Sequence, residues 1–207
     1  MTDDFLVLTV RDFAAATAEK TPTPGGGSVA GAVGMLGTAL GEMSLNFTRG
    51  KKKFAEHEEF YAHLAGRLAK ARAMFADLVA DDVAAYSYFQ ETAKLPDGPE
   101  KQQATQTATA AAIAVPREAA KLALAVLEDL AAFSDKCNPW LITDLVAAAV
   151  LATAVTHLSD LNVRVNVPSL ADRQSADDLR KASRDDIGRA RELLANIERV
   201  GDSILDK

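Results

Sequence analysis

"TPTPGGGSVAGAVGMLGTALG", residues 21–41, divides into two parts with opposite physical properties. The first part holds two prolines and three consecutive glycines, which do not continue a helix or a strand. The second part is built from small apolar residues and predicts a helix that runs from Ser28 to about Phe47, with the Ser28 hydroxyl as its N-cap. A very flexible tripeptide therefore separates a stiff segment from a helix N-terminus.

Four glycines recur in this helix at spacings of three and four residues: Gly31, Gly34, Gly37 and Gly41. Each interior glycine costs about 1 kcal/mol of helix propensity relative to alanine. A row of glycines on one face lets another backbone approach closely. The row predicts tight packing against a neighbouring helix, and contact with a ligand or with a second subunit stay as alternatives.

The rest of the chain also predicts helices and almost no strand. We expect helices over residues 10–20, 28–47, 54–95, 100–134, 140–166 and 171–204. Thr9 is the expected N-cap of the first helix, and Pro116 is expected to kink or divide the fourth. The chain is therefore predicted to be a single all-α domain, residues 1–207. We expect an orthogonal or up-and-down bundle of five to seven helices, in which residues 172–207 form a C-terminal amphipathic helix or helix pair.

Composition and charge exclude several classes of protein. The single cysteine, Cys137, allows no intrachain disulfide and predicts a buried thiol in a reducing, cytoplasmic compartment. The net charge of −6 argues against a nucleic-acid-binding protein. The acidic N-terminus does not resemble a secretory signal, and no apolar run reaches about 18 residues without polar interruption, so no membrane span is predicted.

Asp82 lies on an apolar helix face. Its neighbours at spacings of three, four and seven are Phe75, Leu78, Val79, Ala85, Tyr86 and Phe89. An unpaired carboxylate is costly to bury, so Asp82 needs partners or works at a site. It is the first candidate for a catalytic residue.

Asp144 also lies on an apolar stripe, one turn into its helix. Since a carboxylate in a first turn faces the positive end of the helix dipole, a structural role is an equal alternative. Asn162 and Asn166 share a helix face, where they either line a polar cavity or cap the helix end. The three histidines show no metal-ligand spacing, so no metal is expected.

The glycine stretch matches neither the dinucleotide-binding fingerprint nor the phosphate-binding loop, and no strand precedes it. A glycine loop at a helix N-terminus can still offer backbone donors to a ligand. Lys51 and Lys52, with Arg49 and Lys53, form the densest basic cluster of the chain. This basic cluster is either a solvated loop or a docking patch for an anionic tail.

Several segments occur together in the order typical of one family: "TPTPGGGSVAG", "NFTRGKKKF", "ADDVAAY", "AVPREAA", "CNPWLITD" and "NVRVNV". From Phe5 to Asp172 the chain resembles the C-terminal family of formiminotransferase-cyclodeaminases, which includes stand-alone methenyltetrahydrofolate cyclohydrolases. The resemblance implies an all-helical homodimer that binds a tetrahydrofolate derivative and needs no other cofactor. It implies chemistry at the one-carbon bridge between folate N5 and N10.

The resemblance also assigns residues. The family's catalytic aspartate falls in a D-x-x-A-[FY] element, which matches Asp82 to Tyr86 here. Its further elements match Asn138, Thr143, Asp144, Asn162 and Asn166. Where family members often carry arginine this chain has Lys101 nearby, which keeps the charge and lacks the bidentate fork.

The function implied is hydrolysis of 5,10-methenyltetrahydrofolate to 10-formyltetrahydrofolate, with Asp82 as general base. Asp144 and Asn138 would orient this base or bind the amino edge of the pterin. The cleft would be lined by the backbone of Gly25, Gly26 and Gly27 together with Ser28. The basic cluster, Lys51 and Lys52 above all, would hold the glutamate tail.

Two alternatives stay open. The first is cyclodeamination, in which N10 of 5-formiminotetrahydrofolate attacks the formimino carbon and ammonia leaves. Cyclodeaminases are commonly fused to a formiminotransferase domain that this sequence does not show, which favours the cyclohydrolase. The second is a non-catalytic helical folate-binding protein, and the apolar surroundings of Asp82 argue against it.

Overall fold

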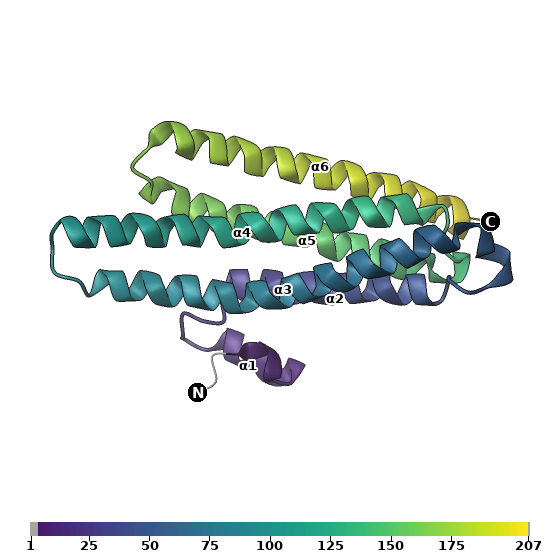
Figure 1. Ribbon diagram of the computed structural model, residues 1–207, viewed down its shortest axis with the longest axis horizontal. Coiled ribbons are helices and arrows are strands. Elements are labelled where there is room, and N and C mark those ends of the chain that lie inside the picture. The colour runs from purple at the N-terminus through teal and green to yellow at the C-terminus, as the bar shows by residue number, and fades with distance from the viewer. Residues whose placement is uncertain (1–3, 207) are drawn as a thin grey trace.

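The computed structural model describes residues 4–206, and this part of the chain folds into six α-helices and four short 3-10 helices without any strand (Figure 1). The prediction of an all-α fold with five to seven helices is confirmed. The α-helices are α1 (Val10–Ala18), α2 (Gly26–Asn46), α3 (Glu58–Ala93), α4 (Pro99–Ser134), α5 (Ile142–Asn166) and α6 (Arg173–Leu205). The 3-10 helices are η1 (Phe5–Val7), η2 (Lys52–His57), η3 (Pro139–Leu141) and η4 (Val167–Ser169).

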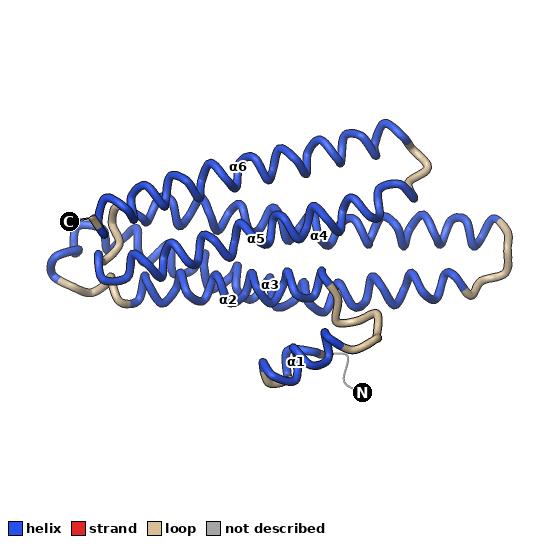
Figure 2. The backbone as a smooth tube through the Cα atoms, turned by 180° about the vertical axis from the view of Figure 1, so that it is seen from behind, coloured by secondary structure: helices blue, strands red, loops and turns tan. Residues whose placement is uncertain are grey.

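Helices α2, α3, α4 and α5 form a four-helix bundle in which each packs on the next and α5 closes the ring against α2. Helix α6 covers the seam between α4 and α5, and α1 lies beside the bundle on the opposite side (Figures 1 and 2). Helices α3 and α4 have 36 residues each, against 21 in α2 and 25 in α5. At one end of the bundle the α3–α4 hairpin therefore continues beyond the first residue of α2.

The glycine row of α2 is used inside the chain. A Cβ atom on Gly34 would overlap the ring of Phe75 of α3, and one on Gly37 would lie 2.9 Å from the Cβ of Leu151 of α5. The other two glycines meet side chains of α3 and α4 in the same way. The prediction of tight helix packing is confirmed, since side chains here would push α2 off both of its neighbours.

Three details of the helix ends correct or refine the predictions. Helix α2 begins at Gly26 with Gly25 as N-cap, so the expected N-cap role of Ser28 is wrong. Pro116 neither divides nor ends α4, which runs unbroken through it. The Thr9 cap of α1 is confirmed, because its hydroxyl accepts the Asp12 N–H at 3.1 Å.

The C-terminal segment is one helix, not a pair. Helix α6 places Ala190, Leu193 and Ile197 against the bundle and leaves its charged face outward. Its N-terminus is capped by Asp172, which accepts the backbone N–H groups of Gln174 and Ser175.

Two segments have the length and apolar composition of a membrane span: Gly26–Asn46, with mean hydropathy 1.2, and Pro139–Ser169, with 1.8. Core helices of a bundle pass the same test. In the most apolar 18-residue window of these two segments, 50% and 44% of the residues respectively are buried inside the bundle.

Candidate active site

Asp82, in the second half of α3, faces the first turn of α2. The Ser28 hydroxyl, fully buried, donates a hydrogen bond of 2.7 Å to Asp82 Oδ2. A Cβ atom on Gly27 would overlap the same carboxylate, so only glycine fits at that position without moving Asp82. Ser28 is therefore the polar partner of Asp82, which the sequence alone did not identify. The adjacent Gly27 has no side chain, and this lets the carboxylate come close to α2.

The start of α2 adds favourable electrostatics to this contact. The first N–H groups of any α-helix lack acceptors within the helix, and they carry the positive end of its dipole. The N-cap residue here is Gly25, which offers no side chain to them. A carboxylate placed at this end is stabilised by the helix, which explains how Asp82 can stand beside apolar walls.

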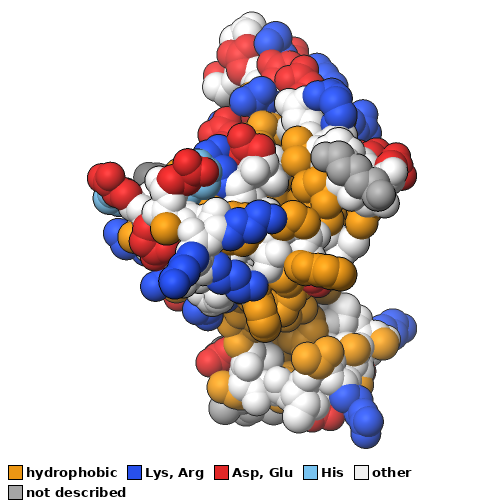
Figure 3. Space-filling view, turned by 90° about the vertical axis from the view of Figure 1, so that its right-hand side faces the viewer, with side chains coloured by type: hydrophobic (Ala, Val, Ile, Leu, Met, Phe, Trp, Pro, Cys, Tyr) orange, Lys and Arg blue, Asp and Glu red, His pale blue; other side chains and the backbone are white. Residues whose placement is uncertain are grey.

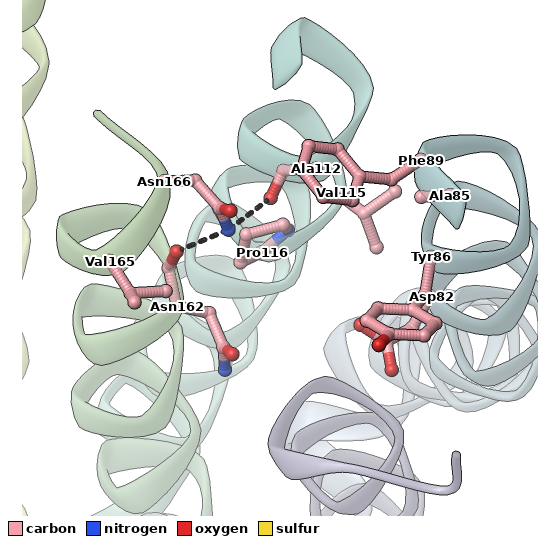
Figure 4. A pocket seen from close by; sticks show the side chains of 10 residues that line it. All are labelled: Asp82, Ala85, Tyr86, Phe89, Ala112, Val115, Pro116, Asn162, Val165 and Asn166. Carbon is pink, nitrogen blue, oxygen red and sulfur yellow. Dashed lines mark hydrogen bonds between the residues drawn. The ribbon is translucent and has the colours of Figure 1, made fainter. Parts of the chain in front are cut away.

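A pocket of about 250 Å³ opens directly above Asp82 (Figure 4). Helices α3, α4 and α5 supply its walls, and the N-terminal end of α2 lies below it. The lining residues are Asp82, Ala85, Tyr86, Phe89, Ala112, Val115, Pro116, Asn162, Val165 and Asn166. Most are apolar, so the few polar groups determine how a ligand is oriented: the Asp82 carboxylate, the Tyr86 hydroxyl and the two asparagine amides.

Asn166 has an identifiable partner in this pocket. Pro116 has no N–H, so the carbonyl of Ala112 lacks its donor within α4. The Asn166 Nδ2 donates to that carbonyl at 3.3 Å and to the carbonyl of Asn162 at 2.8 Å (Figure 4). Asn166 thus lines the pocket, and its amide nitrogen also ties α5 to the proline-containing turn of α4.

Asn162 of α5 lies beside the glycine stretch at the start of α2. Its Nδ2 donates to the carbonyl of Leu158 at 2.9 Å and lies 3.5 Å from where a Cβ on Gly26 would be. The start of α2, Asp82 of α3 and Asn162 of α5 therefore converge, although the sequence separates them widely.

Two aromatic residues stand at the rim. Tyr86 and Phe89 follow Asp82 on the same face of α3, and each is about two-fifths exposed, 39% and 40% respectively. Half-exposed rings beside a pocket offer flat surfaces on which a planar heterocycle can stack. Phe89, Val115 and Pro116 line the pocket but were not among the predicted site residues. The one sequence feature that could have pointed to them is the proline inside a helix, Pro116.

The structure places the other predicted site residues at the opposite end of the bundle. Helices α2 and α5 are antiparallel, and Asp144 precedes Asn162 by about 27 Å along α5, at 1.5 Å per residue. Thr143 lines a different hollow, with the C-terminal end of α6. Lys51 and Lys52 are exposed at the start of η2, also at that end. Within one chain these residues therefore do not join the Asp82 pocket.

Asn138 is occupied by loop contacts. Its backbone N–H donates to Thr48 Oγ1, its Nδ2 donates to the carbonyl of Phe47, and its Oδ1 accepts the N–H of Trp140. These bonds tie the loop before α5 to the end of α2. The expected contact between Asn138 and the catalytic base does not form in the chain.

Lys101 and Asp160 do not line the Asp82 pocket. Lys101 pairs with Asp97 at 2.9 Å near the tip of the α3–α4 hairpin. Asp160 of α5 is buried and accepts a hydrogen bond of 2.8 Å from Ser183 of α6. Within residues 4–206, no three His, Cys, Asp or Glu side chains lie close enough together to hold a metal ion.

Comparison with known proteins adds independent information. The formiminotransferase-cyclodeaminase family profile matches residues 9–185. A methenyltetrahydrofolate cyclohydrolase of Methylorubrum extorquens is 31% identical over 82% of this chain and 84% of its own length. The formimidoyltransferase-cyclodeaminase of Mus musculus is 31% identical over 81% of the chain, which spans only 32% of that longer protein.

The fold agrees with these matches. The crystal structure of a formiminotetrahydrofolate cyclodeaminase from Thermotoga maritima superposes with a TM-score of 0.81, at 26% identity, over 96% of both chains. The helical bundle is thus shared with a solved relative over nearly the full length of both chains. The chain belongs to the formiminotransferase-cyclodeaminase family.

Proposed function

We propose that the protein is a methenyltetrahydrofolate cyclohydrolase, which converts 5,10-methenyltetrahydrofolate into 10-formyltetrahydrofolate. The observation that carries the proposal is the Asp82 carboxylate, fixed by Ser28 below a largely apolar pocket. The methenyl carbon is flat and shares a positive charge with N5 and N10. Apolar walls suit the flat ring, and the carboxylate attracts the charged carbon.

Asp82 is placed to act twice. In the first step a water oxygen bonds to the methenyl carbon and its proton passes to Asp82, which leaves a neutral tetrahedral centre. In the second step Asp82 returns the proton to N5 and the bond between this carbon and N5 breaks. The remaining hydroxyl proton leaves as the formyl C=O forms. The sum consumes one water molecule and releases one proton.

The other pocket residues bind and orient. The Asn162 and Asn166 amides stand where they can face the polar edge of the pterin, and Tyr86 where it can stack on the ring. A volume of about 250 Å³ is below the usual range for whole ligands, so the pocket fits the ring system while the benzoyl-glutamate part lies outside. We propose that the protein works as a homodimer in the cytoplasm and needs no metal or redox cofactor.

Cyclodeamination is the second candidate, because the Thermotoga maritima structure matches this chain over 96% of both lengths. In that reaction N10 bonds to the formimino carbon and ammonia leaves, and Asp82 would carry the proton between the two nitrogens. Stand-alone relatives carry either name, so the match in length does not separate the two reactions. Hydrolysis comes first because the cyclohydrolase relative matches at 31% identity over 84% of its own length. The mouse cyclodeaminase has the same identity over only 32% of its length, and the Thermotoga maritima cyclodeaminase is 26% identical.

One assay separates the candidates. Purified protein is given 5,10-methenyltetrahydrofolate or 5-formiminotetrahydrofolate, and the methenyl absorbance is followed against a protein-free blank. Loss of absorbance above the blank supports hydrolysis. Gain of absorbance with ammonia release would replace it by cyclodeamination, and silence on both with measurable folate binding would leave a non-catalytic binding protein.

The matched variant is Asp82→Asn, which keeps the shape and removes the base. We expect an unchanged circular-dichroism spectrum and a loss of turnover of at least about a hundredfold. Wild-type turnover in this variant would remove Asp82 from the mechanism.

A further inference from the structure

The two asparagines of the Asp82 pocket are held by backbone carbonyls. Asn166 donates two hydrogen bonds from its amide nitrogen, one to the carbonyl of Ala112 at 3.3 Å and one to that of Asn162 at 2.8 Å. An amide nitrogen carries only two protons, so this one has no donor left. The Nδ2 of Asn162 donates in the same way to the carbonyl of Leu158 at 2.9 Å. What Asn166 offers a ligand is therefore its oxygen, Oδ1.

Both amide oxygens remain open to a ligand. Within residues 4–206, no hydrogen-bond donor reaches Oδ1 of Asn162 or of Asn166. Both side chains line the pocket, on the wall opposite Asp82 (Figure 4). The α5 wall of the pocket therefore presents two acceptors.

Tyr86 presents the opposite polarity. Gln90 Nε2 donates to the Tyr86 hydroxyl oxygen at 3.4 Å, which leaves the hydroxyl proton for another acceptor. Tyr86 follows Asp82 by one helical turn on the same face of α3. The α3 side of the pocket thus combines one carboxylate with one donor.

The pocket supplies these acceptors with no cation of its own: of the described residues that line it, none is Lys or Arg. The basic cluster lies at the other end of the bundle, and Figure 3 faces that end and shows basic side chains gathered on it. Acceptors left without donors in a largely apolar pocket are costly to bury. A ligand that fills the pocket must therefore bring donors to the α5 wall.

We propose, on the basis of the proposed function, that the asparagine oxygens select a reduced pterin by its N8–H group and that Pro116 fixes the orientation of Asn166. With the methenyl carbon at Asp82, the O4 atom of the pterin, which flanks N5, faces the Tyr86 hydroxyl. The edge across the ring system then faces α5. This edge carries two donors, the 2-amino group and N8–H, and one amide oxygen accepts from each.

The oxidation state of the pterin decides whether this match exists. In 7,8-dihydropterins and tetrahydropterins N8 carries a proton. In fully oxidised folic acid N8 is an aromatic nitrogen with a lone pair, which loses the hydrogen bond and is repelled by an amide oxygen. A site built to hydrogen-bond an N–H group rejects the analogue without it far more strongly than an apolar pocket does.

Pro116 acts as a positioning residue. It leaves the Ala112 carbonyl without its donor within α4, and this carbonyl holds one proton of the Asn166 amide. The proline inside the helix therefore sets which end of the amide faces the ligand, without a hydrogen bond of its own.

Binding of 7,8-dihydrofolate and of folic acid tests this selection without any turnover. The two ligands have the same tail and differ by the hydrogens on N8 and C7. In isothermal titration calorimetry we expect the wild-type protein to bind 7,8-dihydrofolate at least about tenfold more tightly. Equal affinity, or a preference for folic acid, would overturn the selection and leave the proposed reaction in place. A wild-type protein that binds no folate at all would overturn the proposed function, and the selection with it.

Asn166→Ala in a Pro116→Ala background isolates the amide oxygen, because the new N–H at 116 bonds the Ala112 carbonyl within α4. We expect the preference for 7,8-dihydrofolate to fall to about threefold or less. An unchanged preference would overturn selection by Asn166. If this double variant does not fold, Asn162→Leu gives the same readout, since the bond from Asn162 to Leu158 lies within α5.

Two single variants separate positioning from binding. Pro116→Ala alone should lower the preference in part, since it releases one proton of the Asn166 amide and lets the group turn. An unchanged preference in this variant would overturn the role of Pro116. Tyr86→Phe is the matched control, because it removes a donor to the O4 atom that both ligands share. It should weaken both ligands equally and keep the wild-type preference, and a collapse of the preference in Tyr86→Phe would contradict the proposed orientation.

Discussion

The hydrogen bond from Ser28 Oγ to Asp82 Oδ2 joins the first turn of α2 to α3 across 54 positions of sequence. It fixes one oxygen of the carboxylate, and within residues 4–206 the other oxygen has no hydrogen-bond donor. The bond is possible because Gly27 has no side chain. The glycine stretch and the candidate base therefore form a single structural unit.

Removal of the Ser28 hydroxyl should affect catalysis more than stability. In Ser28→Ala the carboxylate loses its only side-chain donor in the described chain, and a hydrogen bond to a charged group is worth about 1.5–3 kcal/mol. We expect kcat to fall about tenfold or more while KM changes little. Ser44→Ala is the matched control, since the hydroxyl of this buried serine of the same helix donates to the Leu40 carbonyl at 3.2 Å, away from Asp82. Equal kinetic effects in both variants would show that Ser28 does not position Asp82.

A methyl group on Gly27 should displace the carboxylate itself. Gly27→Ala places a Cβ onto Asp82, so we expect a folded protein with turnover reduced about a hundredfold. Gly66→Ala makes the same chemical change on α3, where nothing lies within 4 Å, and should raise the free energy of unfolding by about 1 kcal/mol with unchanged kinetics. Full activity of Gly27→Ala would refute the idea that this position makes room for Asp82.

Asn166 and Pro116 should be energetically coupled. Asn166→Ala leaves the Ala112 carbonyl without a donor and should lower the free energy of unfolding by about 1–2 kcal/mol. In a Pro116→Ala background the cost should shrink, because the new N–H at 116 can bond that carbonyl within α4. A double-mutant cycle by urea denaturation measures the coupling. Additive effects would mean that the two residues act independently.

Cys137 should give the stability a dependence on alkaline pH. Burial raises the pKa of its thiol from 9.0 to about 11. The folded state then holds the proton more tightly than the unfolded state, so the stabilisation is complete below pH 9 and is lost as the pH rises to about 11. The difference in free energy of unfolding between wild type and Cys137→Ala should change by about 1–3 kcal/mol over this range. A difference that stays constant from pH 8 to pH 11 would contradict the assignment.

Many features of this fold can be predicted from the sequence because they depend on residues close together in the chain. Helical periodicity and the proline and glycine breaks gave the six helices, and the apolar neighbours of Asp82 gave the candidate base. The partner of Asp82 was not readable, since Ser28 contacts it only through the packing of α2 on α3. The same limit applies to Asn138 and Asp144, whose segment resembles a site element. Their distance from Asp82 follows from the antiparallel arrangement of α2 and α5, which no short stretch of sequence encodes.

Where α2 begins also determines how much room the site has. The helix starts at Gly26, level with Asp82 and Asn162, while α3 and α4 continue past it. The pocket lies next to this helix start, and one more turn of α2 would add about 5.4 Å of helix on that side. Replacement of the segment from Pro22 to Gly25 by four alanines should therefore let α2 grow into its own binding site and close it. In this fold the size of the ligand-binding space is controlled by the length of a backbone element, and the residues that prevent helix growth act on specificity without touching the ligand.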